Sequence, residues 1–461
     1  MKKNAFPTKD GFSYAVKRIL GSRLYILFVM LSLFIGQVFA LEIPVAILLF
    51  LALTLGFFFA EDLRFFTPVL LGAVCVVSVK HTPFLPYESD YLYTAALPYA
   101  IVLGAVLIMG ITVFVIRRRH ASAPFSSLRL KWGFLAFFAA MLLSGLFQEN
   151  ALKNLAYAAG IGIGFIGIYL LFGLFHPRTR ENAHHFLFSL MCVGLLISAE
   201  LLVLYFRTVA FENGLPVKTS ILIGWGTWTT IGVMLGMCLP APFYFARTAE
   251  RGYPLYLAAG LVMLTALLLS ASRASWLYGG VILLFSLCLL ALGGKHRRAS
   301  RRILFALFVL GALGAILLFP KILAFAQFGA GDNGRFEIWG AAIRSFLAAP
   351  VFGRGFFNTD IVLEGFPAIL PYMYHNTPLQ MLGSAGAVGL ALYAYHRFET
   401  VRLLWRKRKS ALSLFLMLTP IALVLFSLTD EHIFHIYPAF FYAIALSFAE
   451  GSYEEEPLIQ K

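Results

Sequence analysis

Three basic side chains stand out as able to do chemistry: Arg273, Arg335 and His375, each in a connection between apolar segments. Guanidinium groups hold phosphate oxygens in pairs, and an imidazole can exchange a proton near neutral pH. Each residue also has an ordinary explanation. Arg273 could be an interfacial anchor, Arg335 could stack on Trp339, and His375 could cap the following helix. The spacing predicts an anion-binding, proton-transferring site and leaves these alternatives open.

The composition predicts that these residues belong to a membrane protein. Of the 461 residues, 60% are apolar, 16% aromatic and 13% charged, and the mean hydropathy is +0.83. A soluble domain normally has about a quarter charged residues. Apolar stretches long enough to cross a bilayer recur along the chain. A cytosolic enzyme, a secreted module and a disordered tail are therefore excluded, and we predict an all-α polytopic membrane protein.

We predict fourteen membrane spans; the third and the last are short, so about 12–14 is the expected range. They cover residues 24–41, 43–60, 65–79, 94–116, 132–148, 155–175, 186–206, 221–246, 254–271, 276–292, 303–319, 377–395, 412–428 and 436–449. The strongest basic clusters, including residues 117–119 and 406–409, then share one side with both termini. By the positive-inside rule, that side is the cytoplasm.

This topology divides the chain into four parts. Residues 1–220 form N-terminal spans, and residues 221–319 form spans that include the connection with Arg273. Residues 320–376 form one large extracytoplasmic loop, and residues 377–461 form the last spans and a short tail. Long loops often carry functional residues, so we expect the site to lie at the large loop.

Within that loop, apolar residues recur at helical spacing over residues 335–347, which predicts a helix. Asp332 or Asn333 would cap its start, and Pro350 would end it. Arg335 would then lie in the first turn, where free N–H groups and the helix dipole favour an anion. We expect this helix to lie along the membrane surface with its apolar stripe toward the lipid.

Acidic residues suggest a second kind of chemistry. Asp430, Glu431 and His432 are consecutive, but a metal site needs three or four ligands in matched geometry, so a solvated loop is the expected structure. We expect neither a metal nor another cofactor. Glu200 falls within a predicted span, where it is either functional or paired with an arginine of a neighbouring span.

Five short motifs follow in order within residues 221–395. They are Ser-Arg at 272–273, Gly-Arg-Phe-Glu-Ile-Trp at 334–339, Pro-Val-Phe-Gly-Arg-Gly at 350–355, His-Asn-Thr-Pro-Leu-Gln at 375–380 and Gly-Ala-Val-Gly at 386–389. This order resembles that of the O-antigen ligase and O-antigen polymerase superfamily of bacterial envelope glycosyltransferases.

The resemblance implies a GT-C-like transferase of the bacterial cytoplasmic (inner) membrane, with an outward-facing site. Such enzymes pass a glycan from an undecaprenyl-diphosphate carrier to the hydroxyl of a lipid- or wall-anchored glycan acceptor, without nucleotide sugar or metal. In that family, arginines at the positions of Arg273 and Arg335 contact the diphosphate, and the histidine at the position of His375 is the candidate base. Further candidates for substrate binding are Arg354, Arg344, Asn376 and Trp339.

Several alternatives stay open at this point. The motifs do not separate a ligase from a polymerase. A multi-span transporter or lipid-linked glycan flippase is the main alternative, for which cations would be expected along a central cavity. Here the basic residues lie at or beyond the outer boundary of the spans, which favours the enzyme. No nucleic-acid partner is expected, because the basic residues follow the membrane topology.

Overall fold

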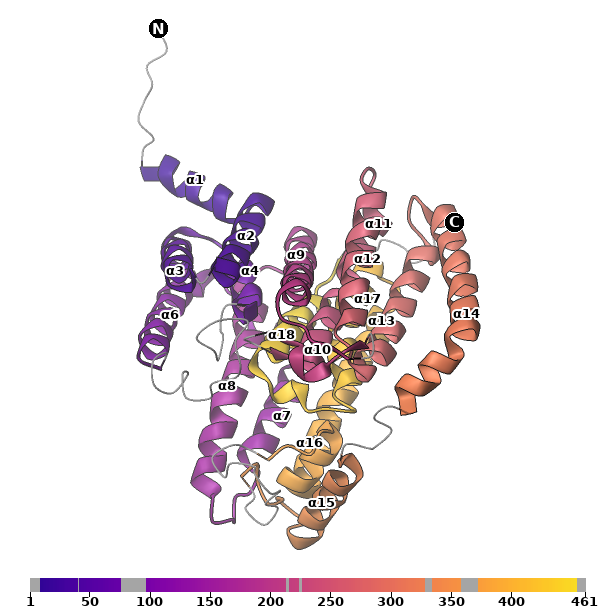
Figure 1. Ribbon diagram of the computed structural model, residues 1–461. Helices are drawn as coiled ribbons and strands as arrows, with labels where there is room; N and C mark the ends of the chain where they lie inside the picture. The colour runs from indigo at the N-terminus through magenta and orange to yellow at the C-terminus, as the bar shows by residue number, and fades with distance from the viewer. Residues whose placement is uncertain are drawn as a thin grey trace. The chain divides into compact units, whose positions relative to one another are not determined.

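The computed structural model describes residues 9–39, 41–75, 97–212, 215–223, 226–327, 334–357 and 372–453. This part of the chain is almost entirely α-helical (Figure 1), with two short antiparallel hairpins. In the first, β1 (Phe211–Glu212) pairs with β2 (Leu215–Pro216); in the second, β3 (Leu222–Ile223) pairs with β4 (Gly226–Thr227). The prediction of an all-α polytopic membrane protein is confirmed.

The helices form two compact units that interleave along the chain. The first unit comprises Met1–Ser127, Leu170–Pro242 and Leu255–Gly280. Its helices are α1 (Lys9–Leu20), α2 (Arg23–Phe39), α3 (Glu42–Phe59), α4 (Phe66–Gly72), α6 (Leu97–Arg118), α9 (Arg180–Arg207) and α10 (Trp228–Cys238). Within this unit, α9 packs against α2, α4 and α10.

The second unit comprises Leu128–Tyr169, Phe243–Pro254 and Val281–Lys461. Its helices are α7 (Lys131–Leu142), α14 (Arg297–Gln327), α15 (Arg335–Ala348), α16 (Thr377–Lys407), α17 (Ala411–Phe426) and α18 (Ile436–Ala449). Four helices contribute residues to both units: α8 (Ala151–Phe175), α11 (Pro240–Thr248), α12 (Tyr253–Leu269) and α13 (Arg273–Leu292). The division into four consecutive parts stays a prediction.

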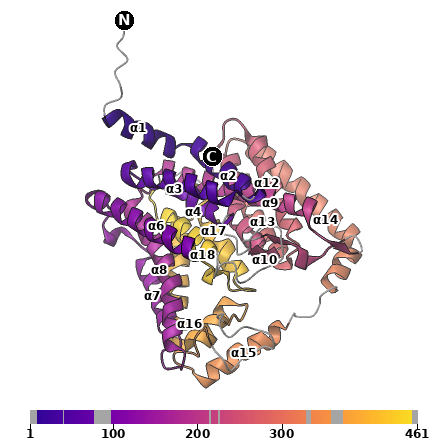
Figure 2. The same cartoon turned by 60° about the vertical axis from the view of Figure 1, so that its left-hand side comes forward.

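An aromatic core holds the second unit together. The ring of Phe134 on α7 stacks on that of Tyr169 on α8, with centroids 3.9 Å apart, and meets the ring of His396 on α16 edge-on at 4.9 Å. The Tyr169 hydroxyl donates to Glu450, just after α18, over 2.6 Å. Stacked and edge-on ring pairs add to the stability from burial. This core fixes α16, which runs beside α7 and begins next to α15 (Figure 1, Figure 2).

Each of the fourteen predicted spans overlaps at least one helix of the described chain. Four helical segments of the described chain are long and apolar enough to cross a membrane: Ala151–Phe175, Arg180–Arg207, Trp228–Thr248 and Arg273–Leu292. A fifth candidate is the pair Ser13–Leu20 and Arg23–Phe39, which is bent by 65°. Several other predicted spans are shorter apolar helices, so the count of about 12–14 stays a prediction.

Several helix boundaries differ from those expected, and three differences matter most for the fold. Residues 221–227 contain the β3–β4 hairpin instead of helix, so the eighth helical segment starts at Trp228. Helix α14 continues through Pro320 to Gln327 instead of ending at residue 319. Helix α16 is broken at Gly386, whose φ of 66° is left-handed and suits glycine. Hydropathy marks apolar length but does not report a turn inside it.

Candidate active site

His375 lies just before α16 in a constrained backbone. Its φ of +52° is uncommon for a residue other than glycine, and such strain persists where surrounding contacts enforce it. Here Gln380 supplies those contacts from the first turns of α16. Its side-chain oxygen accepts the N–H of Tyr374 over 2.7 Å, and its side-chain nitrogen donates to the carbonyl of Tyr372 over 3.0 Å. The chain that enters His375 is therefore fixed to α16.

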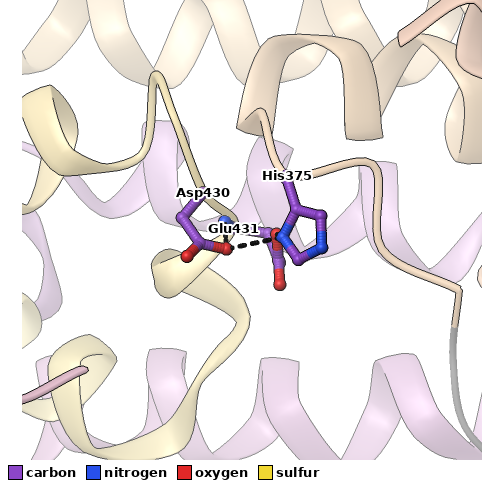
Figure 3. Close-up of side chains that lie close together, drawn as sticks. All are labelled: His375, Asp430 and Glu431. Carbon is purple, nitrogen blue, oxygen red and sulfur yellow. Dashed lines mark hydrogen bonds and ion pairs between the residues drawn. The ribbon is translucent and has the colours of Figure 1, made fainter. Parts of the chain in front are cut away.

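The ring of His375 meets two carboxylates from the connection between α17 and α18 (Figure 3). Its Nδ1 lies 2.9 Å from Asp430 Oδ1 and 3.0 Å from Glu431 Oε2. The His375 side chain is 40% exposed, whereas Asp430 and Glu431 are 13% and 6% exposed. The expectation of a solvated loop was wrong: both acids turn inward because they bind the imidazole.

These partners set the charge of the ring. Hydrogen bonds to Asp430 and Glu431 raise the pKa of His375 to about 10, against the opposing effect of burial. Burial also opposes ionisation of Asp430, but nearby His432 and the hydrogen bond from His375 hold its pKa well below the usual range. At neutral pH the ring is therefore an imidazolium, which differs from the expected base that titrates near neutrality.

The same cluster has the composition of a possible cation site. His375, Asp430 and Glu431 each place one potential ligand atom within 4.8 Å of the others. Two further imidazoles are near: His432 Nε2 lies 3.3 Å from Asp430, and His435 Nε2 lies 3.9 Å from Glu431. However, His375 Nδ1 already forms a hydrogen bond with Asp430 and lies within ion-pair distance of Glu431, whose Oε2 has no hydrogen-bond partner among the described residues. A protonated histidine between the two carboxylates therefore fits the geometry.

Helix α15 carries Arg335 at its first position, as the sequence predicts. Its N-cap residue is Gly334, with a φ of 72°. Asp332 and Asn333 themselves lie outside the described residues.

The side chain of Arg335 makes no specific contact with the described part of the chain. Among the residues that the structure describes, its guanidinium has no hydrogen bond, ion pair or ring contact. The alternative of stacking on Trp339 is not found there, since the Trp339 ring instead meets Phe336 edge-on at 5.6 Å. An arginine in the first turn without a protein partner is suited to bind an anion.

Tyr374 ties α15 to the segment that ends at His375. Its hydroxyl donates to Ser345 on α15 over 2.9 Å, and its ring is fully buried. Ala341, Ala342 and Tyr372 complete a small buried cluster with it. The elements that carry Arg335 and His375 therefore form one packed assembly within the second unit.

Residues 258–394 of the chain match the family model described as O-antigen ligase. This part of the chain is similar to O-antigen ligases. The predicted superfamily is thereby confirmed, and the match supports a glycan-transferring function in surface polysaccharide synthesis. No curated protein matches the chain. The matched range contains Arg273, α15 and His375, whereas Asp430 and Glu431 lie beyond it.

The Pro-Val-Phe-Gly-Arg-Gly motif, which lies in the region that matches the O-antigen ligase model, is held between two helices. The N–H of Arg354 donates to Gly383 of α16 over 3.0 Å. The Asn154 side-chain oxygen on α8 accepts the N–H groups of Phe356 and Phe357 over 2.6 and 3.1 Å. Sequence reasoning missed Asn154, although a fully buried amide in an apolar helix is a signal for such a role.

Two of the other candidate residues have structural partners. Arg354 donates from Nη1 to Gln148 over 3.3 Å. Asn376 caps α16 by accepting the N–H of Leu379 over 3.0 Å, and its amide donates to Leu428 over 2.7 Å. By contrast, Arg344 is exposed on α15 and contacts no ionic or hydrogen-bonding partner in the described ranges. Binding of substrate by these residues stays a prediction.

Arg273 belongs to the first unit, where it begins α13 after a tight turn from α12. The preceding Ala271 has a φ of +52°. Arg273 is exposed and has no ion-pair or hydrogen-bond partner among the described residues. Burial and the charge of Arg273 lower the pKa of Lys218, which places a second cation in its electrostatic field. Glu200, in the same unit, is completely buried within α9.

Proposed function

We propose that this protein transfers a glycan from an undecaprenyl-diphosphate carrier to an acceptor hydroxyl. The reaction would take place on the outer face of the bacterial cytoplasmic membrane, with both termini of the protein in the cytoplasm. The observation that carries this proposal is the pairing of His375 with two buried carboxylates inside an assembly that also carries Arg335. The acceptor is a lipid- or wall-anchored glycan for a ligase, or another carrier-linked glycan for a polymerase.

Arg335 and Arg273 would act on the leaving diphosphate. Negative charge grows on that group as the glycosidic bond breaks, and fixed guanidinium groups stabilise charge where it develops. Both arginines lack a protein partner within the described residues, so no internal ion pair has to break first. Because these charges can do the work of a divalent cation, we propose a metal-independent transfer.

His375 would contribute a third positive charge. Asp430 and Glu431 engage Nδ1, which leaves Nε2 as the ring atom that can donate to a phosphate oxygen. The base role implied by the family resemblance would require a neutral ring, and the two carboxylates oppose that form. We therefore assign His375 to binding and stabilising the diphosphate as an imidazolium. The proton of the acceptor hydroxyl would then pass to the departing diphosphate, or to water, as the new glycosidic bond forms.

The decisive experiment is a deletion in the native host, with envelope glycans resolved on gels and the undecaprenyl-linked pool analysed by mass spectrometry. Full-length chains that accumulate on the carrier and disappear from the final acceptor identify a ligase. Single repeat units that remain while long chains disappear identify a polymerase. If neither pool changes in a host without a redundant enzyme, the transferase proposal is wrong and the transporter alternative replaces it.

A further inference from the structure

Helix α15 carries a stripe of apolar side chains that no described part of the chain covers. Phe336, Ile343 and Leu347 are 70%, 48% and 71% exposed. At about 100° per residue, these three side chains lie within about 40° of one another around the helix axis. Val351, just after the helix, is also exposed, at 53%. A stripe of this kind on a solvated helix would be unfavourable in water, so its environment requires an explanation.

The opposite side of α15 is packed, which fixes the direction of the stripe. Ala341, Ala342 and Ser345 are at most 4% exposed, and the Ser345 hydroxyl accepts a hydrogen bond from Tyr374. Helix α15 also contacts α16 along this side (Figure 1, Figure 2). The helix cannot rotate to bury Phe336 or Leu347 without losing these contacts. The stripe therefore points away from the second unit.

Two arginines flank the stripe. Relative to its centre, Arg344 lies about 80° to one side and Arg335 about 100° to the other. Neither guanidinium has a hydrogen-bond or ionic partner within the described chain. An apolar stripe between two cations matches the layers of a bilayer surface, where acyl chains lie below negatively charged phosphates. With 14 residues, α15 is too short to span the membrane itself.

We propose that α15 docks on the outer leaflet of the membrane, with its apolar stripe among the upper acyl chains and both arginines at the level of the phospholipid phosphates. The occupant is a phospholipid surface because a protein partner would not require cations on both flanks of the stripe. Arg344 is then a headgroup anchor. In a step that rests on the proposed function, Arg335 is held at the depth where a membrane-embedded carrier presents its diphosphate.

Nitroxide depth measurements test the docking without any glycan substrate. Single labels are placed through Leu347→Cys and Ile343→Cys, with Ala348→Cys as a matched control that is exposed but rotated by about 100° from Leu347. The protein carries Cys288→Ser and is reconstituted in nanodiscs of phosphatidylcholine and phosphatidylglycerol. Labels at positions 343 and 347 should be accessible to oxygen at a depth of about 5–10 Å, whereas the label at 348 should be accessible to a water-soluble nickel reagent.

Two outcomes overturn the docking. If labels at 343 and 347 are as accessible to nickel as the label at 348, the stripe lies in water. If oxygen and nickel both fail to reach them, protein covers the stripe. The anchoring role of Arg344 is tested separately: Arg344→Gln should make the label at 347 shallower, and an unchanged depth contradicts it. Since no transfer is measured, failure of the proposed function leaves the docking result intact.

Discussion

At the residue scale, the two carboxylates on His375 determine how transfer depends on pH. If the imidazolium binds the diphosphate, the rate should be constant through neutral pH and should fall as pH rises past about 10, where the ring loses its proton. Asp430→Asn should move this fall to lower pH, because one of the two anions that stabilise the charged ring is removed. Initial rates with carrier-linked glycan from a deletion strain, measured from pH 6.5 to 10.5, provide the test.

A matched control uses a remote acid. Glu250→Gln removes an exposed carboxylate that pairs with Lys295 and should leave the pH at which the rate falls unchanged. A rate that rises with pH instead of falling would assign His375 the role of base.

The same charge state links His375 to protein stability. Its pKa is raised from 6.5 to about 10 in the folded protein, so the extra stability is fully present below pH 6.5 and is lost as pH rises through about 10. Wild type should therefore melt at a higher temperature than His375→Gln at pH 6.5, and the difference should shrink by pH 10. Thermal unfolding in detergent checks this, and a difference that grows with pH would refute it.

Arg335 provides a test of the anion site. Arg335→Ala should lower transfer by about 100-fold or more, since removal of one fixed donor to a developing oxyanion typically costs that much. Arg335→Lys should retain part of the rate, because it keeps the charge but loses the two-pronged geometry. Arg344→Ala is the matched control on the same helix, and the proposed headgroup role predicts a much smaller loss. Equal losses for the two alanine variants would argue against a specific anion site at Arg335.

Sequence alone could nominate His375, Asp430 and Glu431 but could not pair them. Asp430 and Glu431 follow the histidine by 55 and 56 positions, and their contact with it depends on how the start of α16 lies relative to the end of α17. The local sequence pattern predicts helix faces and caps, but it does not predict contacts between distant positions. The two acids were therefore predicted to lie in a solvated loop. The charge of His375 follows from the pairing and was missed for the same reason.

At the element scale, the segment around Gly353 depends on close backbone contact with α16. Gly353 has a φ of +67°, and a Cβ there would come within 2.3 Å of the Ser384 backbone. Gly353→Ala should therefore destabilise the protein by roughly 1–3 kcal/mol or more. Gly160→Ala is the matched control, because a Cβ at Gly160 meets nothing within 4 Å and alanine favours the helix. Melting temperatures of the two variants in detergent should differ in that direction.

Hydropathy located the helices well and their interruptions poorly. The last predicted span, residues 436–449, has the bounds of α18. The eighth span was started seven residues early, because Ile221, Leu222 and Ile223 are apolar whether they lie in a strand or a helix. Pro320 was taken as a helix end, yet α14 continues through it. Tertiary contacts determine where such helices begin and end, and local sequence propensity alone does not predict these positions.

At the scale of the whole molecule, the orientation in the membrane rests on charge. Ser126 and Lys409 are exposed beside basic clusters, and both are predicted to lie in the cytoplasm, whereas Ala348 on α15 is predicted to lie outside. In a Cys288→Ser background, a membrane-impermeant maleimide applied to right-side-out vesicles should label Ala348→Cys. Ser126→Cys and Lys409→Cys should be labelled only after permeabilisation. The remaining native cysteines, Cys75, Cys192 and Cys238, are buried and should react little.

The labelling results test the number of spans and the orientation of the protein separately. If Ser126→Cys and Lys409→Cys react from opposite sides, an odd number of spans separates them and the predicted count between them is wrong. If Ala348→Cys reacts only from the cytoplasmic side, the whole orientation is inverted. Arg335 and His375 would then face the compartment in which nucleotide sugars are available, and transfer from a carrier on the outer face would be impossible. The proposed function therefore requires that Ala348 be labelled from outside, independently of any measurement of glycan.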